Sequence, residues 1–172
     1  MSSCASRQLE EVTFRRTVIP VQELLDAAGK YFKKLMKNRP ERIELEIEPM
    51  EAKVIGDVNQ LRFLLENLID EALTVREDGV IRLQARQDNE YIRFLFTDTR
   101  REKSVEELNQ LFYPNLARMT SGEKGELRGT EYLVCKQIIR DHDEFAGRRG
   151  CRINAEPAEG GGFTVYFTIP RR

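Results

Sequence analysis

Oxygen-bearing side chains gather on one face of a helix that the sequence predicts over residues 58–73, and these residues are the best suited to chemistry. Asn67, Asp70 and Glu71 lie three or four positions apart, so a helix places them side by side, with Thr74 following on the same face. Carboxylate and carbonyl oxygens are the ligands that hard cations such as Mg²⁺ prefer. The same spacing is typical of a solvated acidic helix face, so the residues alone leave both interpretations open.

Further polar residues lie where predicted elements begin or end. Asp98 follows a predicted strand, where it is either a turn residue or a binding carboxylate. Glu131 falls in the first turn of a predicted helix, where the helix dipole favours a carboxylate by about 0.3–1 kcal/mol at an exposed site. It would therefore occupy the position at which a helix attracts phosphate. The loop at 113–128 carries Arg118 and Lys124, which suit phosphate contacts or an ordinary surface loop.

Composition excludes several classes of function. Lys and Arg number 28 and Asp and Glu 29, so the net charge is −1, whereas nucleic-acid-binding domains normally carry a basic excess. The single histidine, His142, excludes a mechanism that needs two. Cys4, Cys135 and Cys151 form no CxxC pair, which argues against a zinc finger or a disulfide scaffold and favours a reducing compartment. No apolar run approaches the roughly 18 residues that span a bilayer, and we expect no membrane insertion.

The elements that must position these residues are pairs of strands separated by single helices. The helix at 58–73 has a continuous apolar stripe and Asp57 as its N-cap. Ile43, Leu45 and Ile47 alternate with glutamates, which predicts a half-buried strand with a solvated acidic face. In chain order the sequence predicts a helix at 20–38, strands at 42–49 and 53–55, the helix at 58–73, a hairpin of strands at 81–85 and 92–96, a short helix at 104–111, a helix at 130–142, and strands at 151–155 and 163–169. This order favours a two-layer α/β sandwich, with a mixed, largely antiparallel sheet of about five or six strands and three main helices on one face.

Five stretches of the chain, taken in order, carry a family resemblance. They are VIGDVNQLRFLLENLIDEAL at 54–73, FTDT at 96–99, NQLFYP at 109–114, GTEYLVCKQIIRDH at 129–142 and EGGGFTVYFTIP at 159–170. Together they resemble the ATP-binding (Bergerat-type) domain of sensor histidine kinases, which shares a superfamily with gyrase, heat-shock chaperones and mismatch-repair proteins. We expect residues 12–172 to form that domain, and residues 1–11 to be a tail or the end of an upstream helix.

The resemblance implies ATP and Mg²⁺ as cofactors and indicates which residues would bind them. The family's Mg²⁺-binding asparagine corresponds to Glu71, its adenine-binding aspartate to Asp98, and its glycine-rich lid exit begins at Gly129. On this basis the nucleotide-binding residues would be Asn67, Asp70, Glu71, Asp98, Lys124 and Gly129, with Glu71 as the Mg²⁺ ligand.

The chain departs from the family pattern at four positions in this region. Glu71 replaces the asparagine and adds negative charge where phosphates would lie. Arg100 and Glu102 stand where the family has glycines, and Glu131 replaces the second glycine of the lid exit. Glycine lets the backbone approach a nucleotide, whereas Arg and Glu add bulk and disfavour positive φ. We therefore interpret Arg100, Glu102 and Glu131 as site-disrupting residues.

These departures favour a degenerate histidine-kinase-type ATPase domain of a two-component signalling protein, acting as a regulatory or interaction module with weak or no ATP binding. An alternative is a working catalytic domain that passes a phosphoryl group to a histidine on a separate dimerisation domain. A third interpretation, an anti-sigma-factor-like kinase, needs an intact nucleotide site and meets the same objections. The implied partner is the pair of dimerisation and phosphoacceptor helices of the same or a related sensor, in the cytoplasm. These residues hold no such helix pair, so we expect no autophosphorylation by the chain alone, and whether it is an enzyme stays open.

Overall fold

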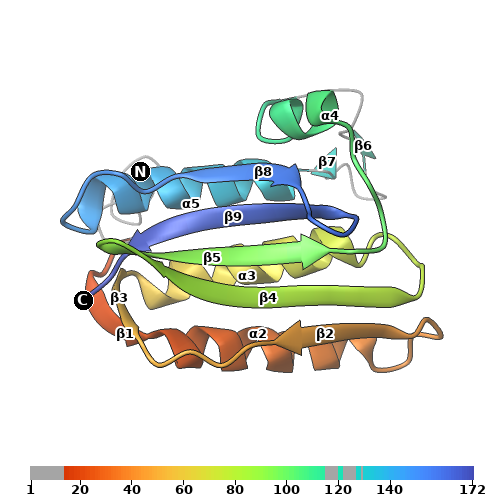
Figure 1. Ribbon diagram of the computed structural model, residues 1–172, viewed down its shortest axis with the longest axis horizontal. Coiled ribbons are helices and arrows are strands. Elements are labelled where there is room, and N and C mark those ends of the chain that lie inside the picture. Colours follow the sequence, from red (N-terminus) through yellow and green to blue (C-terminus); the bar gives the residue numbers. More distant parts are fainter. Residues whose placement is uncertain (1–13, 115–119, 122–126, 129) are drawn as a thin grey trace, which may run out of the picture.

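The computed structural model describes residues 14–114, 120–121, 127–128 and 130–172, which form two layers (Figure 1). One layer is a five-stranded sheet in the order β2-β4-β5-β9-β8, in which β2 pairs parallel with β4 and the other neighbours are antiparallel. The strands are β2 (Ile43–Ile47), β4 (Gly79–Asp88), β5 (Tyr91–Asp98), β8 (Ile153–Pro157) and β9 (Phe163–Pro170). The sheet is therefore mixed and largely antiparallel, as the sequence predicts.

The second layer consists of three long helices on one face of the sheet, α2 (Val21–Met36), α3 (Val58–Ala72) and α5 (Glu131–Phe145) (Figure 1). Each helix turns an apolar stripe toward the strands, and together with the inward residues of β4, β5 and β9 these stripes form the core. Phe94 and Phe167 stack at its centre with ring centroids 4.8 Å apart. The expected two-layer α/β sandwich is confirmed.

Several element boundaries differ from the sequence-based expectation. The predicted strand at 53–55 is β3 (Lys53–Gly56), and it leaves the main sheet to pair with β1 (Thr17–Pro20), which the sequence analysis missed. The last helix runs three residues further than predicted, to Phe145. The short helix α4 (Val105–Gln110) has the expected capping box between Ser104 and Glu107. Within the predicted loop, β6 (Thr120–Ser121) pairs with β7 (Leu127–Arg128).

A buried polar contact fixes α5 against the start of α3. The backbone N–H of Asp57 donates to Nε2 of His142 at 3.1 Å, so the proton of this fully buried ring resides on Nδ1, which donates to the Ile138 carbonyl at 2.8 Å. The Asp57 side chain caps α3 by accepting from the Gln60 N–H at 3.1 Å, as predicted. Burial lowers the pKa of His142, because the charged form would lose its hydration.

Candidate functional site

Asp98 ends β5 beside the last turn of α3, and its carboxylate is already bound within the chain. Arg100 Nε donates to Oδ1 at 2.9 Å and Arg100 Nη2 to Oδ2 at 2.9 Å, while the Arg100 backbone N–H donates to Oδ1 at 3.0 Å. The two side chains are 5% and 1% exposed. A bidentate, charge-assisted pair of this kind is among the strongest polar contacts that a protein forms.

The remaining donors of Arg100 bind carbonyl groups at the end of α3 and in the turn that follows it. Nη1 donates to Val75 O at 2.9 Å and to Glu77 O at 3.0 Å, and Nη2 donates to Ala72 O at 2.6 Å. All five N–H donors of the guanidinium therefore have acceptors. The last carbonyls of a helix lack intrahelical partners and carry partial negative charge, so the guanidinium also caps α3.

Two glycines allow this close packing around Asp98. A Cβ at Gly79 would collide with the Arg100 side chain, and one at Gly162 would collide with the Asp98 carbonyl oxygen. Gly162 also has a φ of +86°, which disfavours other residues. These two glycines thus make room for the Arg100 side chain and the Asp98 backbone of this chain.

The polar side chains on α3 form hydrogen bonds either within their own segment or with α2. Asn67 is buried, and its Nδ2 donates to the Phe63 carbonyl of its own helix at 2.7 Å. Asp70 accepts a 2.6 Å hydrogen bond from the Tyr31 hydroxyl on α2. Burial and this contact with Asp70 raise the pKa of Tyr31. Thr74 Oγ1 donates to the Glu71 carbonyl at 2.6 Å.

Glu71 of α3 and Glu131 of α5 both lie near enough to the buried thiol of Cys135 for their charges to act on it. The thiol lies 3.6 Å from the Leu64 carbonyl, and its pKa is raised by burial and then by the negative charges of Glu131 and Glu71. Glu131 lies in the first turn of α5, and its Oε1 is enclosed without a hydrogen-bond partner among the described residues.

The remaining candidates contribute less to the site. Glu102 is exposed, and no contact of its side chain with Asp98 is seen. Lys124, Gly129 and Arg118 lie outside the described residues. Within the described ranges, no three His, Cys, Asp or Glu side chains gather closely enough to hold a metal ion, and no helix is long and apolar enough to cross a bilayer.

Sequence reasoning missed two of these contacts. It treated Arg100 as bulk replacing a glycine, whereas the side chain is the ion-pair partner of Asp98. An arginine two residues after a buried strand-end aspartate is the signal that could have found this pair. Tyr31 was assigned no role, and no sequence pattern marks it as the partner of Asp70.

Comparison with known proteins gives one family match and several structural matches. A family model described as histidine kinase-, DNA gyrase B- and HSP90-like ATPase matches residues 56–172. The catalytic domain of histidine kinase ThkA in a nucleotide-free form is 21% identical with a TM-score of 0.69, over 91% of this chain and 97% of that chain. The mycobacterial sensor histidine kinase MprB is 19% identical with a TM-score of 0.69, over 92% and 99%.

A third structure, histidine kinase ThkA in complex with the response regulator protein TrrA, is 18% identical with a TM-score of 0.68, over 99% of this chain and 47% of that chain. No curated protein sequence matches the chain. At these identities the structural matches show a shared fold.

Proposed function

The chain belongs to the histidine kinase-, DNA gyrase B- and HSP90-like ATPase family, and we propose that it is a degenerate member of the histidine-kinase type, with weak or no ATP binding. In this proposal residues 12–172 form the ATPase-like domain of a two-component signalling protein. The domain acts in the cytoplasm as a regulatory or interaction module, and its partner is the dimerisation and phosphoacceptor helices of the same or a related sensor.

The observation that carries this proposal is the internal ion pair between Asp98 and Arg100. A carboxylate that reads adenine must accept a hydrogen bond from the exocyclic amino group. Here both oxygens of Asp98 accept from Arg100 at 2.9 Å. Three hydrogen bonds from Arg100 occupy the Asp98 carboxylate, whose side chain is 5% exposed, so a nucleotide would have to compete with a buried pair. Stranding either charge of such a pair costs about 3–5 kcal/mol.

The phosphate side of the same region gives independent support. A triphosphate with Mg²⁺ needs cationic or N–H donors and a positive potential. Glu131 places a carboxylate at the N-terminus of α5, and Glu71 adds a second negative charge nearby. The Asn67 amide donates to its own helix. Among the described residues, the donor set therefore does not fit a Mg²⁺–nucleotide complex.

Calorimetric titration of the full chain with Mg²⁺ and ATP or ADP tests the proposal. We expect no saturable heat with nucleotide in the micromolar range, and micromolar affinity would contradict the proposal. The variant Arg100→Gly restores the glycine and frees Asp98, and Arg101→Ala removes a nearby exposed arginine as the matched control. If the wild type and Arg101→Ala do not bind but Arg100→Gly gains affinity, the Arg100 side chain is what closes the adenine site. If a folded Arg100→Gly variant also fails to bind, the carboxylates Glu71 and Glu131 are the next positions to change.

A further inference from the structure

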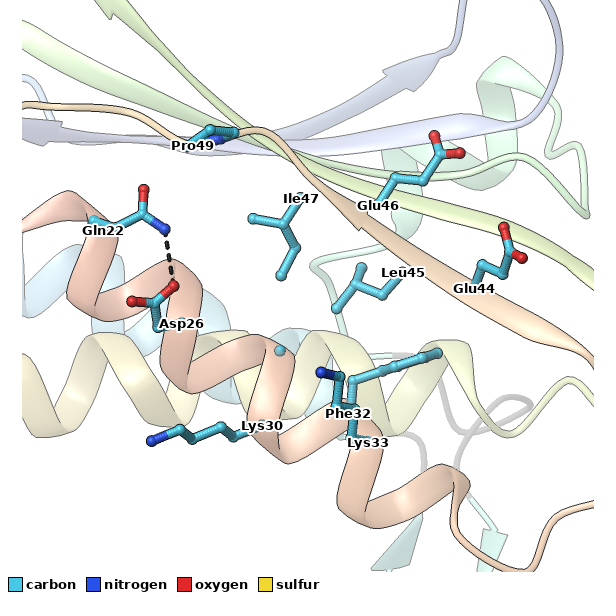
Figure 2. A pocket seen from close by; sticks show the side chains of 11 residues that line it. Gln22, Asp26, Lys30, Phe32, Lys33, Glu44, Leu45, Glu46, Ile47 and Pro49 are labelled. Atoms are coloured by element: carbon cyan, nitrogen blue, oxygen red, sulfur yellow. Dashed lines mark hydrogen bonds between the residues drawn. The ribbon is translucent and has the colours of Figure 1, made fainter.

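A groove that neither Asp98 nor Arg100 lines runs between α2 and the outermost strand of the sheet (Figure 2). Its volume is about 850 Å³, and one wall is a stripe along α2 formed by Gln22, Asp26, Lys30 and Lys33. The other wall is β2, whose Leu45 and Ile47 side chains point toward α2 while Glu44 and Glu46 point away. Gly29 lets α2 pack closely against β2, since a Cβ there would lie 3.1 Å from Ile47 Cδ1.

The backbone of β2 is unpaired along this groove. Glu48 N–H donates to Leu83 O on β4 at 3.2 Å, and Arg42 O accepts from Gly79 N–H at 3.0 Å. Backbone groups of successive residues point to opposite sides of a strand, so those of Leu45 and Ile47 point away from β4. Because β2 is the last strand of the sheet, no described residue pairs with them. An edge of this kind is a template for one more strand.

The charge pattern on the open face of the sheet indicates what that strand would carry. Arg82 of β4 pairs with Glu46 at 3.0 Å, and Arg86 pairs with Glu48 at 2.8 Å. A basic row on β4 thus faces an acidic row on β2. Glu44 is exposed and has no ion-pair partner among the described residues. Opposite charges directly across two strands stabilise a sheet, so the next strand outward would be basic.

A second copy of the chain does not meet these requirements. Pairing two β2 edges would place the glutamate rows Glu44, Glu46 and Glu48 opposite each other, and like charges in cross-strand positions are destabilising. Side chains of an added strand that point into the groove would meet the half-buried Leu45 and Ile47, and these surroundings suit apolar side chains. A neighbouring apolar hollow at Met50 and Pro49 continues the groove along the same path.

We propose that the free edge of β2 binds an extended segment of a partner protein as a sixth strand, and that this segment alternates Lys or Arg with apolar residues. The basic side chains lie beside Glu44 and Glu46, and the apolar ones enter the groove against Leu45, Ile47 and Phe32. This mode of recognition takes its affinity from backbone hydrogen bonds and its specificity from alternate side chains. The proposal is independent of whether the domain binds nucleotide.

The test uses the ¹⁵N-labelled full chain and three synthetic heptapeptides followed by NMR. The first alternates Lys and Val, and alternate backbone nitrogens are methylated. Methylation removes the N–H donors along one edge of the extended peptide, so that the peptides cannot pair into sheets with one another. The second replaces Lys by Glu, and the third is the Lys peptide N-methylated on both edges. We expect the Lys peptide to shift the amides of Leu45, Ile47 and Lys30 and to bind about tenfold more tightly than the Glu peptide. The third peptide should leave the spectrum unchanged.

Two variants separate the proposed site from a general charge effect. Glu44→Lys should weaken binding of the Lys peptide and strengthen binding of the Glu peptide, and a variant that merely unfolded could not reverse the preference. Glu159→Lys makes the same charge change in the turn before β9 and should bind like the wild type. The proposal is overturned if no peptide shifts these amides, if both singly methylated peptides bind equally, if the shifts fall on β5 and β9 instead, or if the chain dimerises through β2.

Discussion

The carboxyl end of β5 and the outer edge of β2 differ in whether their polar groups have hydrogen-bond partners within the chain. At the end of β5, both oxygens of Asp98 and every donor of Arg100 are bound within the chain. At the edge of β2, the backbone groups of Leu45 and Ile47 have no partner among the described residues. The side chains of the first region are buried, whereas the second region borders the groove between α2 and β2 (Figure 2 shows the groove).

The difference concerns the free energy that a ligand must supply. A ligand of Asp98 must first break a buried ion pair, whose separation leaves an uncompensated charge in the interior. A ligand of β2 displaces only water from exposed amides, and water is exchanged at little net cost. On the proposals made above, internal partners close the nucleotide site at Asp98, while the exposed edge of β2 stays available to a partner protein.

The largest expected effect is the loss of stability in Arg100→Ala. This substitution leaves the buried Asp98 carboxylate without its cation, and the carbonyls of Ala72, Val75 and Glu77 lose the guanidinium donors. The unfolding free energy should therefore fall by about 3–5 kcal/mol. Urea unfolding followed by circular dichroism measures it. The control Arg101→Ala breaks an exposed ion pair with Glu77 and should cost about 0–1 kcal/mol.

A rescue variant distinguishes the ion pair from simple loss of packing. Adding Asp98→Asn to Arg100→Ala removes the stranded charge and should recover part of the lost stability, because an unpaired amide is cheaper to bury than an unpaired carboxylate. Equal costs for Arg100→Ala and Arg101→Ala would mean that the β5 end is not closed, and the comparison with β2 would fail.

The next effect is a fall in stability on mild acidification, caused by the second buried polar contact, His142. Its pKa in the folded chain lies below the ordinary 6.5 because the ring is buried and its charged form would lose hydration. Below pH 6.5 the unfolded chain therefore binds more protons than the native one. The unfolding free energy decreases as the pH is lowered. One titrating group changes the unfolding free energy by at most about 1.4 kcal/mol per pH unit.

Urea unfolding at intervals between pH 7.5 and pH 5 measures this slope. Exposed carboxylates such as Glu48 and Glu107 have pKa values lowered below 4.5, so their contribution to stability is lost only at lower pH. The control His142→Leu should be less stable at every pH but should lack the slope. A wild type that is equally stable at pH 7.5 and pH 5 would show that protonating the ring is not costly.

The sequence predicts most of the fold because local patterns determine most of its elements. Apolar stripes mark α2, α3 and α5, and the alternation around Leu45 marks β2. It misses β1, whose four residues carry no alternation and which pairs, among the described strands, with β3 alone. It also misses the contact of Tyr31 with Asp70, because the two residues come together only when α2 packs against α3. The departure at Arg100 is visible in the sequence, but its bidentate geometry depends on the path of the chain after β5.

The smallest expected effect is that of Glu44→Lys on the stability of the unliganded chain. Glu44 is exposed and forms no ion pair among the described residues, so the unfolding free energy should change by no more than about 0.5 kcal/mol. Urea unfolding at neutral pH, with Glu159→Lys as the control for net charge, measures the difference. A loss above about 1 kcal/mol would mean that Glu44 already has a partner, and β2 would then resemble the self-satisfied end of β5. If Glu44→Lys leaves the unfolding free energy unchanged but reverses the preference between the Lys and Glu peptides, then Glu44 acts in binding a ligand at the β2 edge and not in stabilising the fold.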